Sequence, residues 1–482
     1  MGDTGADMPA FPAPPSSARA LGLAGALALV VAASFAFRFI DWDEGPTRGL
    51  ILLMMLGAMA RLGAPGAGAT VGPRLNFLVN AVIAGAAVLW LSTAVATITT
   101  SARTGAIPMD QGQTTWRAGR LLLRGENPYG FGALVDFQAY FDRMSQRKAA
   151  GLQPEIAPDA LKSALQAYDS TLAAPERDAI LPPAPAEGPA ALEAHLLGYK
   201  YGPLFPLLAL PFVVLGQPAA IMALNALVAA LAVAALYVTL RERVGAPLAK
   251  LGLAALLCDN TILYNFVMKS GTDIWALLFC ILAVRATLRD RPSWGALALA
   301  IGFGFKIFPC ALLFPMLLKD RRVAPAFAFA GVAAAIYAPF ALADFSGLVH
   351  NVFLWPAYLG TDTTSWVAFA PPLAGRIARL LGLAAIAALW ARYLLGREPS
   401  LFRVLALVAL LALVTSAAFH NNYVPWASIW VIAALVERFG PSNSKSSASR
   451  SVYGPSRIFT SSGGMVEFVR ASIRTRQEGK TT

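Results

Sequence analysis

Residues 218–244 read PAAIMALNALVAALAVAALYVTLRERV. Residues 218–240 of this stretch carry no charged side chain, and Arg241 and Arg243 follow them directly. A helix needs about 20 apolar residues to cross the hydrocarbon core of a bilayer, and cytoplasmic loops are enriched in Lys and Arg. The stretch therefore predicts a transmembrane helix that begins outside the cytoplasm and ends inside it.

The whole chain has the same character. Of its 482 residues 57% are hydrophobic and 14% are charged, and the mean hydropathy is +0.58. Soluble domains are about 45–50% apolar and about 25% charged. Apolar runs recur from Leu21 to Val436, which excludes a cleaved secretory signal followed by a soluble domain. We predict an all-α integral membrane protein, a polytopic helix bundle with about 10–13 transmembrane segments.

The formal net charge of +12 is not spread evenly. Residues 100–200 hold 10 Lys/Arg and 11 Asp/Glu, whereas residues 437–482 hold 8 Lys/Arg and 3 Asp/Glu. The remaining excess lies in short loops between apolar runs. This is the positive-inside pattern of a membrane protein, and we expect no nucleic-acid partner. The three cysteines lie in apolar runs without metal-ligand spacing, so we predict no metal site from them: Cys258, Cys280 and Cys310.

We divide the chain into five parts. The expected parts are a disordered N-terminus (1–19), N-terminal transmembrane helices (20–99), an extracytoplasmic loop (100–200), a transmembrane bundle (201–437) and a basic, disordered cytoplasmic tail (438–482). This arrangement puts both termini in the cytoplasm. In the loop, residues 116–124 predict an interfacial helix with Thr114 or Thr115 as its N-cap, and a small lobe of short helices follows.

Two apolar stretches of the bundle contain prolines that oppose a regular span. Residues 201–216 include Pro203, Pro206 and Pro211, which predicts a broken or re-entrant segment. Residues 294–318 have basic loops at both ends and are interrupted by Pro309 and Pro315, which predicts two half-helices.

Two lysines in or beside this part of the chain have possible acidic partners. Lys306 and Asp259 both lie in apolar runs, where an ionisable group is costly, and could form a pair. Lys269 and Asp273 could form a second ion pair at an outer turn.

Four stretches carry a resemblance to a known family. They are DQGQTTWRAGRLLLRGENPY (110–129), YKYGPLF (199–205), KIFP (306–309) and HNNY (420–423). Together and in this order they resemble the GT-C superfamily of polytopic glycosyltransferases, and most closely glycosyltransferase family 87, which is similar to polyprenyl-phosphate-mannose-dependent mannosyltransferases. Two departures stand out: Gly202 replaces the usual second proline, and Asp110 follows the third apolar run where the family's aspartate follows the first.

The resemblance implies an enzyme. It would transfer a sugar, mannose or a pentose, from a polyprenyl-phosphate donor to a hydroxyl of a lipid, glycan or protein acceptor on the extracytoplasmic face of an inner membrane. A loop aspartate would take the acceptor proton, and cations would stabilise the departing phosphate. No cofactor is needed for such an inverting displacement, although Asp110 together with Asp41 or Asp43 could bind a divalent metal.

The resemblance assigns site residues as follows. Asp110 is the candidate catalytic base, with Asp41 and Asp43 as competitors and a helix cap as its structural alternative. The candidate substrate-binding residues are Arg117, Arg120, Lys200, Tyr201, Lys306, His420 and Tyr423. Cations among them could instead extend to lipid headgroups, and the aromatic residues could anchor the chain at the interface.

A secondary transporter or lipid-carrier flippase is the rival interpretation. A transporter should place charges near the bilayer midplane and contain internal repeats. We find no tandem repeat, and most polar candidates collect on the outward side beside the long loop. A non-catalytic scaffold that kept the fold is the third interpretation.

Overall fold

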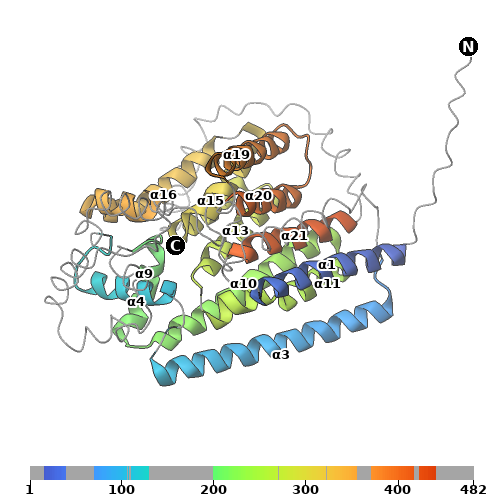
Figure 1. Cartoon of the computed structure of the whole chain (residues 1–482), viewed down its shortest axis with the longest axis horizontal. Coiled ribbons are helices and arrows are strands. Elements are labelled where there is room, and N and C mark those ends of the chain that lie inside the picture. Colours follow the sequence, from blue (N-terminus) through green and yellow to red (C-terminus); the bar gives the residue numbers. More distant parts are fainter. Residues whose placement is uncertain are drawn as a thin grey trace, which may run out of the picture. The chain divides into compact units, whose positions relative to one another are not determined.

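A computed structural model describes residues 16–39, 70–105, 107, 110–129, 199–269, 271–321, 323–354, 371–416 and 423–440. Every regular element in these residues is a helix (Figure 1), so the all-α prediction is confirmed. The α-helices are α1 (Ser16–Phe39), α3 (Pro73–Thr104), α4 (Asp110–Leu123), α9 (Leu204–Val214), α10 (Pro218–Val244), α11 (Ala246–Cys258), α12 (Asn260–Ile262), α13 (Asp273–Leu288), α14 (Pro292–Phe305), α15 (Ile307–Leu313), α16 (Ala324–Ala343), α17 (Phe345–Leu348), α19 (Pro372–Leu394), α20 (Leu401–Thr415) and α21 (Val424–Phe439). Two π-helices, η2 (Leu263–Met268) and η4 (Val349–Leu354), and a 3₁₀ helix, η3 (Phe314–Arg321), complete the set.

Four of the described helices are long and apolar enough to cross a membrane: α3, α10, α16 and α19. A fifth span is possible if α11 and the segment Asn260–Met268, which meet at a bend of 49°, count as one. Further apolar helices are shorter, among them α9, α14 and α20. The protein is therefore an all-α polytopic membrane protein. The small lobe of short helices expected after residues 116–124 lies outside the described residues.

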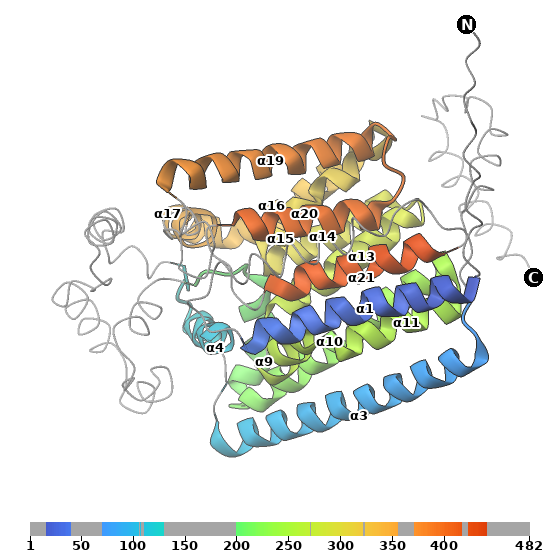
Figure 2. The same cartoon turned by 45° about the vertical axis from the view of Figure 1, so that its right-hand side comes forward.

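The helices divide into a buried centre and an apolar outer layer. In α21 every residue from Val424 to Val436 is buried, and α1, α10, α11 and α20 pack around it (Figure 2). By contrast, only 6% of the apolar window of α3 is buried. A helix that is apolar all round belongs in a core or in lipid, so the exposed apolar side chains of α3 are its lipid-facing surface.

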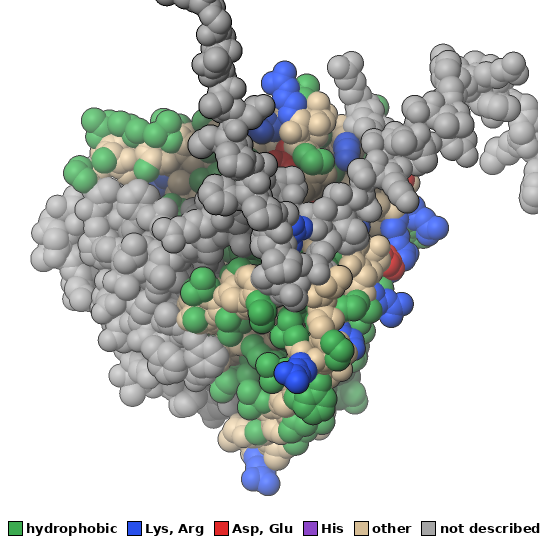
Figure 3. All heavy atoms as spheres, turned by 90° about the vertical axis from the view of Figure 1, so that its right-hand side faces the viewer, with side chains coloured by type: hydrophobic (Ala, Val, Ile, Leu, Met, Phe, Trp, Pro, Cys, Tyr) green, Lys and Arg blue, Asp and Glu red, His purple; other side chains and the backbone are tan. Residues whose placement is uncertain are grey.

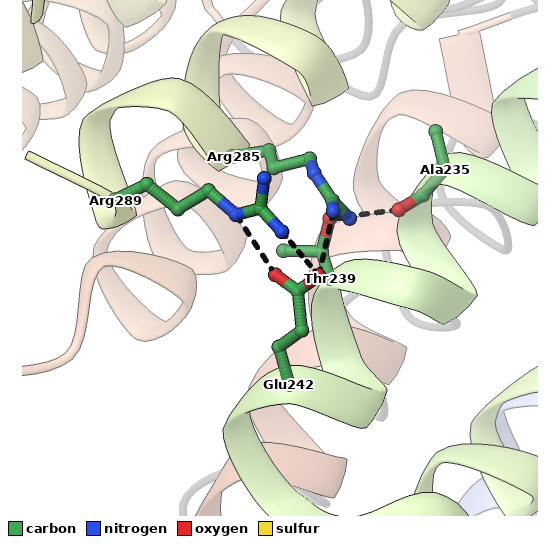
Figure 4. Close-up of polar contacts among 5 residues, drawn as sticks. All are labelled: Ala235, Thr239, Glu242, Arg285 and Arg289. Atoms are coloured by element: carbon green, nitrogen blue, oxygen red, sulfur yellow. Dashed lines mark hydrogen bonds and ion pairs between the residues drawn. The ribbon is translucent and has the colours of Figure 1, made fainter. Parts of the chain in front are cut away.

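One end of the bundle collects arginines. Glu242 of α10 forms ion pairs with Arg285 of α13, 2.6 Å away, and with Arg289, which directly follows α13 (Figure 4). Glu437 of α21 forms an ion pair with Arg243 of α10 at 2.8 Å. The C-terminal ends of α10, α13 and α21 therefore meet, and Lys and Arg side chains gather on this face (Figure 3). Two of the basic segments predicted from the sequence, those of Arg243 and of Arg285 with Arg289, thus share one end of the bundle.

The interruption predicted in residues 294–318 separates α14 from α15 at Lys306, whose backbone is extended (φ −151°, ψ 122°). Pro309 is the physical cause, because it has no N–H to donate to the carbonyl of Phe305, four residues earlier, and its ring would clash with that carbonyl in a continuous helix. The N–H of Gly202 donates to this oxygen instead, at 3.1 Å. The break thus lies one turn before the proline that causes it.

Two local expectations are corrected or sharpened. The interfacial helix begins at Asp110, so neither Thr114 nor Thr115 is its N-cap; Thr115 lies inside α4, with its hydroxyl oxygen 3.0 Å from that of Tyr199. Within the proline-rich segment, α9 is a helix of 11 residues with Pro211 inside it. At 1.5 Å per residue it is about 16 Å long, too short to cross the membrane alone, as predicted.

Gly202 is required by close packing. A Cβ atom at this position would overlap the carbonyl oxygen of Gly304 and lie 2.9 Å from the hydroxyl of Tyr337. We predict that Gly202→Ala destabilises the protein by about 1–3 kcal/mol, the usual cost of overpacking, and lowers the midpoint of thermal unfolding in detergent. The matched control is Gly331→Ala in α16, where a Cβ atom meets nothing within 4 Å. Equal midpoints for the two variants would contradict the packing argument.

Candidate active site

A buried ion pair occupies the end of the bundle opposite the arginines. The ammonium of Lys306 lies 2.6 Å from both carboxylate oxygens of Asp273. The side chain of Asp273 is fully buried and that of Lys306 is 14% exposed. Asp273 is the first residue of α13, where the positive end of the helix dipole also stabilises a carboxylate. The break at Lys306 and the start of α13 thus bring together two charges that neither helix would tolerate alone.

Two tyrosines flank the ammonium. The Nζ of Lys306 lies 4.8 Å from the ring centroid of Tyr423 and 6.0 Å from that of Tyr201. Tyr423 immediately precedes α21, and Tyr201 lies just before α9. A cation within about 6 Å of an aromatic face is attracted by the ring quadrupole. Three predicted substrate-binding residues, far apart in the sequence, therefore meet at one place.

Below the ion pair the site has an aromatic floor. Trp275 stacks on Phe305 with ring centroids 5.1 Å apart, Phe305 stacks on Phe279 at 5.9 Å, and Phe205 contacts Trp275 at 6.2 Å. The indole N–H of Trp275 donates to the side-chain oxygen of Asn225 in α10 at 2.6 Å. Trp275 and Phe305 are close in sequence to Asp273 and Lys306, so this aromatic cluster adjoins the ion pair, of which Lys306 is the more exposed member.

A tyrosine cluster connects the ion pair to α4 and the turn that follows it. The hydroxyl of Tyr129 donates to the backbone carbonyl of Tyr201 at 2.8 Å, and the ring of Tyr199 lies between them, 5.8 Å from Tyr129 and 5.6 Å from Tyr201. The side-chain amide of Asn351 donates to the carbonyl of Tyr129 at 3.0 Å. Burial raises the pKa of both Tyr129 and Tyr199. Both phenols therefore stay protonated at neutral pH and serve as hydrogen-bonding supports.

The remaining candidates are placed less completely. Asp110 and Arg117 lie in α4, but their side chains lie outside the described structure; Arg120 is half-buried in the same helix. Helix α4 packs on α9, where a Cβ at Gly119 would lie 3.0 Å from Val213. Lys200 is half-buried beside Tyr201. His420, Asp41 and Asp43 lie outside the described residues.

The two ion pairs considered from the sequence are wrong. Lys306 takes Asp273 as its ionic partner rather than Asp259, and Lys269 lies with its Nζ 4.8 Å from the ring centroid of Tyr264. The pair that forms joins residues 33 positions apart on different helices, so their spacing gives no signal. The available signal was topological: both residues lie where a helix begins or ends at the end of the bundle opposite the arginines.

No metal-binding cluster accompanies the pair. Within the part of the chain that the structure describes, no three His, Cys, Asp or Glu side chains come close enough to hold a metal ion. The described site therefore offers one neutralised ammonium, aromatic faces and tyrosine hydroxyls. Such a set suits a ligand that has both an apolar or sugar face and a negative group, because an ammonium carries only hydrogen-bond donors.

The pair can be tested by a double-mutant cycle. We predict that Lys306→Met destabilises the protein by about 3–5 kcal/mol, because it leaves a buried carboxylate without a partner. Adding Asp273→Asn should recover at least half of this loss. The measurement is equilibrium or thermal unfolding in detergent. As a control, Arg289→Met removes one partner of an exposed cluster and should cost at most about 1 kcal/mol. Additive losses in the cycle would show that the two side chains are not coupled.

A comparison with known protein families matches the part of the chain that contains the ion pair. The model of Glycosyltransferase family 87 matches residues 199–417. No curated protein and no solved structure matches the chain. The matched segment begins at Tyr199 and contains Tyr201, Asp273 and Lys306, whereas α4 with Asp110 precedes it. The resemblance to this family is thus confirmed over residues 199–417, which contain the stretches YKYGPLF and KIFP but not the other two, and this match indicates a glycosyltransferase.

Proposed function

We propose that this glycosyltransferase moves a sugar, mannose or a pentose, from a polyprenyl-phosphate donor to an acceptor hydroxyl at the extracytoplasmic face of the inner membrane. The acceptor would belong to a lipid, a glycan or a protein. The proposal goes beyond the family match in its donor, its topology and its catalytic base.

The position of the Lys306–Asp273 pair along the bundle carries the proposal. Trp275, two residues after Asp273, bonds Asn225 of α10, and Glu242 of α10 marks the arginine-rich end. Seventeen residues of helix separate Asn225 from Glu242, or about 25 Å at 1.5 Å per residue. This separation is close to the about 30 Å thickness of the hydrocarbon core. With the arginine-rich end in the cytoplasm, the pair lies at the depth of the outer headgroups.

A donor carried on a lipid chain has its phosphate at that depth. Its prenyl tail would remain among the exposed apolar side chains, while its phosphate approaches Lys306 between the rings of Tyr201 and Tyr423. Lys306 is already neutralised by Asp273, so it offers directed hydrogen bonds to the phosphate with little excess charge. Arg117 and Arg120 of α4 would supply the positive charge that stabilises the leaving phosphate.

The chemical step assigned to Asp110 balances without a cofactor. The Asp110 carboxylate takes the proton of the acceptor hydroxyl, and the hydroxyl oxygen attacks the anomeric carbon of the donor sugar. The bond between that carbon and the phosphate oxygen breaks on the opposite face, and the polyprenyl phosphate leaves with the electron pair. The position of Asp110 at the start of α4, a helix that packs on α9 beside the tyrosine cluster, supports this assignment.

The test is transfer of radiolabelled sugar from synthetic polyprenyl-phosphate donors by the full chain in proteoliposomes. We predict that Asp110→Asn lowers the transfer rate by about 10²–10⁴-fold, the usual contribution of a general base, with donor binding unchanged. Asp290→Asn is the matched control, because Asp290 follows α13 at the arginine-rich end with φ +56°, a conformation that asparagine tolerates. Its transfer rate should match that of the wild type.

Two other outcomes would redirect the assignment. Loss of transfer in Asp41→Asn or Asp43→Asn, with Asp110→Asn active, would move the base to the earlier loop. If the folded wild-type chain transfers no sugar from any donor but moves lipid or solute across the bilayer, the proposal fails and the transporter interpretation replaces it.

A further inference from the structure

A second buried carboxylate lies away from the candidate active site. Asp259 separates α11 from α12 at the bend of 49°, and its side chain is fully buried. It is surrounded by α1, α11 and α21, whereas the Lys306–Asp273 pair lies between α13, α14 and the residues before α9 and α21. No step of the proposed transfer involves it.

Asp259 lies near the middle of the membrane. The indole N–H of Trp90 in α3 donates to the carbonyl of Leu257 at 2.8 Å, which places the end of α11 beside Trp90. Trp90 is 17 residues from the start of α3 and 14 from its end, or about 25 Å and about 21 Å. A single ionised group at this depth costs about 2.5–3.5 kcal/mol or more, so a positive partner is expected.

The two oxygens of this carboxylate differ. Oδ1 accepts hydrogen bonds from both the backbone N–H and the hydroxyl of Thr261, at 2.9 and 2.6 Å. Hydrogen bonds of this kind stabilise the ionised form. Oδ2 accepts no hydrogen bond of ordinary geometry, although it is buried. The two hydrogen bonds from Thr261 to Oδ1 cap the helix that follows Asp259. Capping therefore does not account for the burial of Oδ2 without a hydrogen bond.

Among the described residues, acceptor oxygens and no cationic side chain lie near the carboxylate. Ser34 of α1 and Ser428 of α21 are fully buried and within hydrogen-bonding reach of Asp259. The hydroxyl of Ser34 already donates to the carbonyl of Val31 at 2.8 Å, and that of Ser428 points to the carbonyl of Pro425 at 3.4 Å. Their lone pairs thus remain available. The C-terminal end of α11 is the negative end of its helix dipole and adds to the negative potential beside Asp259. Asp259 makes no ion pair within the described residues.

We propose that this cluster binds one sodium ion, with Asp259 Oδ2 and the hydroxyl oxygens of Ser34 and Ser428 as ligands. Hard cations take carboxylate, hydroxyl and carbonyl oxygens, and the ends of interrupted helices provide such oxygens in membranes. One positive charge neutralises one carboxylate, whereas a divalent ion would leave a net charge in the apolar interior. The ion would fix the bend between α11 and α12 against α1 and α21.

The test uses the full chain in detergent at pH 7.5, with sodium chloride replaced by choline chloride at constant ionic strength. The expected result is a saturable rise of several degrees in the unfolding midpoint with sodium, because a ligand that binds only the folded state stabilises it. Binding of ²²Na⁺ to the purified chain should saturate at one ion. Asp259→Asn should abolish both effects.

Three further variants keep the proposal falsifiable. Ser34→Ala and Ser428→Ala each remove one ligand and should raise the sodium concentration at half-saturation at least several-fold, which covers the case in which Asp259→Asn does not fold. Asp344→Asn is the matched control, because Asp344 caps α17 by accepting from the N–H of Gly347 at 2.8 Å; it should keep the sodium response.

Two outcomes would overturn the proposal. One is an unfolding midpoint of the wild type that is identical in sodium and choline. The other is a midpoint that rises with acidification equally in both salts and loses this dependence in Asp259→Asn, which would assign a proton to Oδ2 in place of sodium.

Discussion

The missing N–H of Pro309 sets the geometry on which the candidate active site depends. Because the carbonyl of Phe305 has no intrahelical donor, α14 ends there and Lys306 adopts an extended backbone. The same carbonyl accepts the N–H of Gly202, which ties the segment before α9 to the end of α14. One backbone constraint therefore places Lys306 and Tyr201 together. It also explains why a glycine is needed at position 202, since the Gly304 carbonyl leaves no room for a Cβ.

The ion pairs described in the bundle form two sets, one at each end of its helices. Arginines and the glutamates that pair with them lie at the ends of α10, α13 and α21, partly open to water. The Lys306–Asp273 pair lies at the opposite end of α13 and is nearly closed from water. Exposed pairs contribute little to stability, whereas a buried pair is costly to break. The first set marks one end of the bundle, and the second lies buried at the opposite end.

Much of this could be predicted from the sequence, for physical reasons that differ by residue. The all-α membrane fold follows from the length of apolar runs such as 218–240, and the shared basic end follows from Arg241 and Arg243. The family motifs singled out Tyr201, Lys306 and Tyr423 one by one, and the structure shows that the two rings lie beside the Lys306 ammonium. The partner of Lys306 could not be predicted, because Asp273 reaches it only through the packing of α13 on α14. The start of α4 at Asp110 was also missed, since the apolar pattern begins only at Trp116.

The contrast between the two buried aspartates shows how the same residue type can serve different purposes in one bundle. Asp273 stands at the N-terminal end of its helix, where the helix dipole and a lysine 33 residues away neutralise it. Asp259 stands at mid-depth, at the negative end of α11, with hydroxyl oxygens for neighbours. A carboxylate whose only role was to cap α12 could be replaced by serine or asparagine without the cost of burying a charge. The proposed sodium ion would neutralise this carboxylate, for which the described side chains supply no ion pair.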